Sequence, residues 1–73
     1  MKKVLVVRGS HDGNLGVYTN VKLAYERCLE YLDGYKVQTS YREVLKSCKS
    51  WGSMIYTDAY DMSCEIQVFY LNE

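Results

Sequence analysis

The hydrophobic and polar positions of the chain follow two periods, one typical of strands and one typical of helices. A continuous apolar run at Val4–Val7 predicts a strand near the middle of a sheet, because such a strand is covered on both faces. Residues Cys64–Leu71 alternate instead, and the face of the odd-numbered positions begins with Glu65 and Gln67. This segment predicts a strand with one buried and one partly solvated face. Two shorter strands are predicted, at residues 15–19 and 53–57.

Two segments between these strands show the helical period. Apolar residues recur at positions 21, 24, 25, 28, 29 and 32, which places them on one face of a helix capped by Thr19 or Asn20. The second helix begins at a capping box, in which Ser40 and Glu43 are spaced to satisfy free N–H groups reciprocally. Its apolar face is predicted to extend as far as Trp51.

The sequence Asp12-Gly13 lies between two apolar runs and predicts a hairpin turn of type I′, which needs positive φ at both central residues. The register is left open, because Gly9 and Gly16 could accommodate a bulge or a longer loop. The predicted order is then strand, strand, helix, helix, strand, strand. Hairpins favour antiparallel neighbours, and two helices can cover one face of the sheet. We therefore predict a single compact α+β domain over residues 1–73, with an antiparallel sheet of about four strands and both helices packed on one face.

Composition narrows the function. Nine Lys and Arg residues balance nine Asp and Glu residues, whereas a nucleic-acid-binding domain usually has a basic excess. Eight tyrosines in 73 residues cannot all be buried in so small a core. Because tyrosine offers a large rigid contact area with a polar tip, this richness favours a contact surface.

The residues that could carry catalysis match no known arrangement. The three glycines after the first strand have the spacing G-x3-G-x2-G, which fits neither the dinucleotide fingerprint nor the Walker loop. His11 and Asp12 are adjacent in a predicted turn, where their side chains diverge into solvent and do not form an acid–base pair. We therefore expect a non-enzymatic protein without a cofactor.

Metal binding is also disfavoured. Asp58 and Asp61 lack the EF-hand pattern, and a solvated turn explains them. Cys28, Cys48 and Cys64 are odd in number and widely spaced, unlike the close pairs of zinc sites. We expect them to be buried, reduced thiols of an intracellular protein.

The sequence also predicts where the protein is found. The apolar run near the N-terminus is too short for a signal peptide, and no stretch is long enough to span a membrane. We expect a cytoplasmic protein.

Three predicted surfaces could contact a partner: the first hairpin, the region around the last turn, and a row on the first helix that lies off its core face. Their residues are Arg8, His11, Asp12 and Asn14, then Tyr56 and Tyr60, then Leu23, Arg27 and Tyr31.

Residues Val4–Gly13, Gly16-Val17-Tyr18 and Lys22-Leu23-Ala24 give the N-terminal half of the chain a recognisable pattern. In this half the chain resembles small early or accessory proteins of tailed bacteriophages, which commonly open with Met-Lys-Lys, a Val-rich strand and a glycine-bearing turn. The resemblance implies a small protein that binds and redirects a host component, including a defence protein. It assigns no functional residue.

We therefore predict a protein-binding module, in the form of a phage-encoded inhibitor or modulator of a host or antiviral-defence protein. One alternative is a nucleic-acid-binding accessory protein that uses Lys2, Lys3, Arg8 and tyrosines of the sheet. A second alternative is a ligand-binding or catalytic domain formed across a homodimer. Strand edges and the apolar Phe69–Leu71 end make a homodimer a further expectation.

Overall fold

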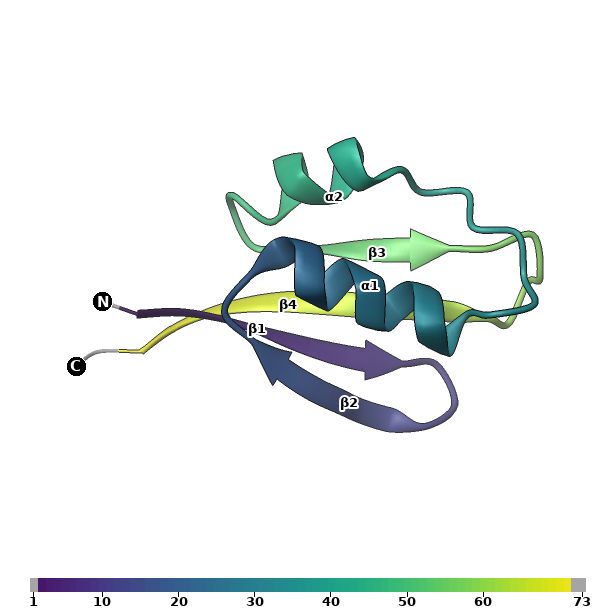
Figure 1. Ribbon diagram of the computed structural model, residues 1–73, viewed down its shortest axis with the longest axis horizontal. Coiled ribbons are helices and arrows are strands. Elements are labelled where there is room, and N and C mark those ends of the chain that lie inside the picture. The colour runs from purple at the N-terminus through teal and green to yellow at the C-terminus, as the bar shows by residue number, and fades with distance from the viewer. Residues whose placement is uncertain (1, 72–73) are drawn as a thin grey trace.

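The structure is a computed structural model that describes residues 2–71 (Figure 1). It confirms the predicted α+β fold and the predicted order of elements. The strands are β1 (Lys2–Gly9), β2 (Gly13–Tyr18), β3 (Gly52–Tyr56) and β4 (Ser63–Leu71), and the helices are α1 (Val21–Tyr31) and α2 (Tyr41–Ser47). The four strands form one antiparallel sheet in the order β2-β1-β4-β3, and both helices cover the same face (Figure 1).

The centre of the sheet is the pairing of β1 with β4. These strands pair over eight consecutive residues, from Lys2 opposite Leu71 to Gly9 opposite Cys64. The prediction that Val4–Val7 lies in the middle of the sheet is therefore confirmed. The pairing also places the two ends of the described chain side by side, at the end of the molecule opposite the β1–β2 and β3–β4 turns (Figure 1).

A single core lies between the sheet and the helices. The strands contribute alternate residues, and the helices contribute one stripe each, as the two periods predict. The fully buried residues are Leu5, Val7, Ala24, Cys28, Leu32, Val44, Cys48, Ile55, Cys64 and Ile66. At about 25 cal/mol per Å² of apolar surface removed from water, these side chains supply most of the stability of the domain.

Both helices begin with side-chain caps. The Asn20 side chain accepts hydrogen bonds from the N–H groups of Lys22 and Leu23, at 2.8 and 3.3 Å. The Ser40 hydroxyl oxygen accepts from the N–H of Glu43 at 3.3 Å. Each cap satisfies donors that the first helical turn leaves free.

The first hairpin differs from the predicted type I′ turn. Gly9 pairs with Gly13, so the loop contains three residues, Ser10, His11 and Asp12. Gly13 has a φ of 71°, and no residue other than glycine has a positive φ within residues 2–71. The loop is thus a three-residue turn closed by a glycine, followed by a register shift between Val7 and Arg8. The prediction was wrong because Asp12 stays at negative φ.

The predicted burial of Trp51 on the second helix was also wrong. Helix α2 ends at Ser47, and Trp51 lies in the turn before β3 with 74% of its surface exposed. A turn between Cys48 and Trp51 breaks the helical spacing that would have carried the indole to the core. The burial of Val44 and Cys48 agrees with the prediction.

Candidate protein-binding site

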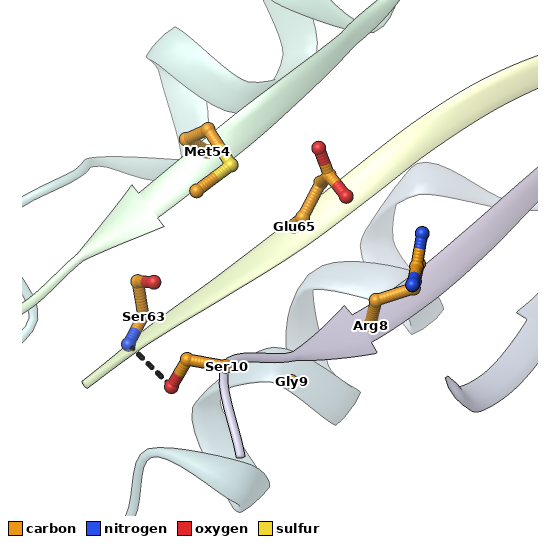
Figure 2. Close-up of a pocket in the computed structure, with 6 residues that line it drawn as sticks. All are labelled: Arg8, Gly9, Ser10, Met54, Ser63 and Glu65. Atoms are coloured by element: carbon orange, nitrogen blue, oxygen red, sulfur yellow. Dashed lines mark hydrogen bonds between the residues drawn. The ribbon is translucent and has the colours of Figure 1, made fainter. Parts of the chain in front are cut away.

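Two loops that are far apart in the sequence meet at one end of the molecule. The first is Ser10–Asp12, between β1 and β2, and the second is Asp58–Met62, between β3 and β4 (Figure 1). They are joined because the Ser10 N–H donates to the Ser63 carbonyl oxygen at 3.1 Å, and the Ser63 N–H donates to the Ser10 hydroxyl oxygen at 3.2 Å. The second of these hydrogen bonds is drawn in Figure 2. The pairing of β1 with β4 thus continues into the two loops.

The last turn of helix α1 contacts the first loop through Tyr31. The Tyr31 hydroxyl oxygen accepts a hydrogen bond from the His11 N–H at 3.0 Å. The Tyr31 ring lies against Gly9, where a Cβ atom would come within 2.5 Å of the ring carbon Cζ. Only glycine therefore lets the last turn of α1 approach the hairpin this closely.

The second loop is folded around a buried threonine. The Thr57 hydroxyl donates to the Met62 carbonyl oxygen at 2.7 Å and accepts from the Ala59 N–H at 3.2 Å. The segment after α1 is also bonded to this loop, because the Asp58 N–H donates to the Lys36 carbonyl oxygen at 3.0 Å. Hydrogen bonds to buried or backbone groups on both sides hold this loop in one conformation.

We call the exposed surface formed by these three segments the turn end. It consists of Ser10, His11, Asp12, Tyr35, Lys36, Asp58, Tyr60 and Asp61, all of which are exposed. The Tyr60 side chain is fully exposed, and His11 Nε2 lies 3.6 Å from Asp61 Oδ2. Three carboxylates face one lysine across this surface, so the turn end is acidic although the whole chain is neutral.

The sequence-predicted contact residues are only partly brought together. His11, Asp12 and Tyr60 lie at the turn end. Arg8 and Asn14 are opposite each other on β1 and β2 and project from the helix-free side of the sheet, and Tyr56 is exposed on β3. Figure 2 shows Arg8 beside Glu65, on the strand next to it.

The row on the first helix does not form a uniform exposed strip. Leu23 is exposed, whereas Arg27 is partly buried. Arg27 forms an ion pair with Glu30, in which Nη1 lies 3.5 Å from Oε1. Tyr31 is partly buried against the hairpin and supports it. The members of the turn end that the sequence analysis did not name as contact residues are Ser10, Tyr35, Lys36, Asp58 and Asp61. The tyrosine richness and the turn residues are evident in the sequence, but the proximity of these residues depends on the long-range pairing of β1 with β4.

The three cysteines are free and buried, as predicted. The Sγ atoms of Cys28 on α1 and Cys64 on β4 lie 2.9 Å apart. The hydrogen bond between these thiols, together with burial, raises the pKa of Cys28, and burial raises the pKa of Cys48. Cys28 and Cys48 therefore stay protonated at neutral pH and are unreactive core residues. The same hydrogen bond to Cys28 lowers the pKa of Cys64.

Within residues 2–71, no group of three or more His, Cys, Asp or Glu side chains is placed to hold a metal ion. No helix in this part of the chain is long and apolar enough to cross a membrane.

A shallow depression of about 250 Å³ opens on the helix-free side of the sheet, lined by Arg8, Gly9, Ser10, Met54, Ser63 and Glu65 (Figure 2). It is open to solvent, and its lining contains one cationic and one anionic side chain, Arg8 and Glu65.

Comparisons with protein-family models, curated proteins and solved structures give no match for this chain.

Proposed function

We propose that this chain is a small protein-binding module that contacts its partner through the turn end. The observation that supports this most directly is the convergence of three loop segments on one exposed, tyrosine-bearing surface. Loops positioned by a rigid sheet are the usual location of binding residues. Tyr60 and Tyr35 supply rigid contact area at low entropic cost, and Ser10 and His11 supply hydrogen-bonding groups beside them.

The hydrogen bonds beneath this surface favour binding without rearrangement. Ser10 is tied to Ser63, His11 to Tyr31, and Asp58 to Lys36. A loop that is already ordered loses less conformational entropy when it binds, so more of the contact energy appears as affinity. The acidic character of the turn end supports a partner whose matching surface is basic.

The finer form of the proposal is a phage-encoded inhibitor or modulator of a host or defence protein. Its support is the resemblance of the N-terminal half to phage accessory proteins and the small size of the domain. The nucleic-acid alternative draws less support, because the turn end is acidic and the helix-free side of the sheet sets Arg8 beside Glu65.

The test is affinity capture from a bacterial lysate at low and high salt, with matched bait proteins. Tyr60→Ala removes the exposed aromatic of the turn end, and Trp51→Ala removes an exposed aromatic from a turn at the opposite end. The proposal expects one protein, retained in stoichiometric amount by the wild type and by Trp51→Ala. Tyr60→Ala should weaken its binding by roughly tenfold or more, as an aromatic hot spot does.

Two results would count against the proposal. If the wild type retains only nucleic acid that is lost at high salt, the nucleic-acid alternative is favoured. If a protein is retained equally by Tyr60→Ala and by the wild type, the contact lies elsewhere on the molecule.

A further inference from the structure

The sheet has one face without a layer on it. We call it the open face: residues that alternate with the core positions and point away from the helices. It consists of Lys2, Val4, Val6, Arg8, Asn14, Val17, Met54, Tyr56, Ser63, Glu65, Gln67, Phe69 and Leu71. A half-solvated antiparallel sheet normally has polar residues on its outer face. Here apolar side chains outnumber charged ones, and Val17 is 64% exposed.

The structure points to a second copy of this chain as the occupant of the open face, in a symmetric face-to-face dimer. The inference is independent of the proposed function, because the turn end is not part of the open face. Two properties of the face argue for a copy of itself: the placement of its charges and its area.

The charges are self-complementary. Arg8 and Glu65 are direct register partners on β1 and β4, the two central strands of the sheet (Figure 2). Within residues 2–71 the charged contacts are His11–Asp61 and Arg27–Glu30, so Arg8 and Glu65 form no ion pair with each other. A two-fold axis that runs between two facing sheets, parallel to β1 and β4 and midway between them, exchanges the positions of these strands. It places Arg8 of each copy opposite Glu65 of the partner subunit, which is what an isologous interface requires.

The same axis matches the remaining rows. The strand order β2-β1-β4-β3 has this axis at its centre, so β1 faces β4 and β2 faces β3 of the second copy. Val4 then faces Phe69 of the partner subunit, because these two residues are register partners within one chain. Val6 faces Gln67 of the partner subunit in the same way, because these two residues are also register partners within one chain.

The area is sufficient for a specific dimer of modest strength. The strands contain 8, 6, 5 and 9 residues. With about 3.4 Å per residue and 4.8 Å between strands, their flat projection is roughly 450 Å². The accessible surface follows each side chain and is larger than this projection. Specific interfaces bury about 600–1,000 Å² per partner, so the open face reaches the lower end of that range. We therefore expect dissociation on the order of micromolar concentrations.

The test is sedimentation equilibrium of the purified chain over a range of concentrations, with charge-reversed variants. Arg8→Glu and Glu65→Arg each place like charges opposite each other twice in the dimer, and each should weaken it by roughly tenfold or more. The double variant Arg8→Glu/Glu65→Arg restores opposite charges across the axis and should dimerise like the wild type. Leu23→Lys, a change to the exposed surface of α1, is the matched control and should have no effect.

Circular dichroism confirms that each variant is folded before its mass is measured. A chain that stays monomeric at every concentration overturns the inference and leaves the open face to a different occupant. A dimer that both single reversals leave unchanged, or that the double variant fails to restore, also overturns it. Tyr60→Ala should dimerise normally, so failure of the dimer and failure of the turn-end proposal can be told apart.

Discussion

The support that α1 gives to the turn end can be tested by removing one oxygen atom, in the variant Tyr31→Phe. The hydroxyl accepts the His11 N–H at 3.0 Å, and the ring that carries it lies against Gly9. Phenylalanine keeps the ring contact and loses only the acceptor. A hydrogen bond contributes about 0.5–1.5 kcal/mol net, and the exposed position of His11 places this one at the lower end, near 0.5–1 kcal/mol.

The loss should be seen first in the first loop and should also lower global stability by a similar amount. An opening free energy lower by about 0.5–1 kcal/mol raises the population of the open loop roughly two- to fivefold, because 1.4 kcal/mol corresponds to a factor of ten. Amide hydrogen exchange followed by NMR should therefore show the His11 N–H exchanging faster by that factor. Amides of Leu5 and Ile66 in the core should change only with global stability. The melting temperature should fall by roughly 2–8 °C.

A matched control is Tyr35→Phe, which removes the hydroxyl of an exposed tyrosine from the same end of the molecule. It should leave exchange at His11 unchanged. If Tyr31→Phe also leaves exchange at His11 unchanged, the hydrogen bond from α1 does not order the loop. The turn end would then be held by two of its three hydrogen-bonded contacts only, Ser10–Ser63 and Asp58–Lys36.

Three further predictions concern the fold. Gly52→Ala places a Cβ against the carbonyl oxygen of Ile66 at a φ of 144°, whereas the Cβ of Gly34→Ala meets open space at a φ of 92°. Both variants cost about 1–2 kcal/mol of backbone strain, and urea denaturation should show a clearly larger loss of unfolding free energy for Gly52→Ala. Ile66→Ala should lower the unfolding free energy by about 2–5 kcal/mol. Glu65→Ala, on the other face of β4, should lower it by less than about 0.5 kcal/mol. Equal losses would contradict the assignment of Ile66 to the buried face of the sheet. Burial raises the pKa of Cys48 in the folded protein, so the stability that its protonated thiol contributes is complete below the unfolded pKa of about 8.5 and is lost as pH rises through the folded value. Urea midpoints should therefore fall less steeply above that pH for Cys48→Ala than for the wild type, and equal slopes would contradict the burial of this thiol.

The elements of the fold follow from local patterns in the sequence. The alternation of Cys64–Leu71 and the helical spacing from Val21 predict a strand and a helix that the structure contains. Two local details differ. The turn at Asp12-Gly13 has one positive φ where type I′ needs two, because Gly9 pairs with Gly13 and leaves three residues in the loop. Trp51 is exposed because α2 stops at Ser47.

The order of the strands and the location of the turn end depend on long-range pairing. No local signal specifies that β1 lies beside β4, which is more than fifty residues later in the chain. That pairing brings Ser10 to Ser63 and thereby His11 to Asp61. Sequence reasoning could therefore name His11, Asp12 and Tyr60 as separate candidates, but it could not place them on one surface.

The central claim is that the turn end contacts a protein partner, and amide chemical shifts test it most directly. The ¹⁵N-labelled chain is titrated with the protein that the wild-type bait retains, and each shifted amide is assigned. The account predicts that the largest shifts fall at residues 10–13 and 58–61, with little change around Trp51 and on the outer side of α2. Large shifts around Trp51 or on α2, with the turn end unchanged, would contradict it.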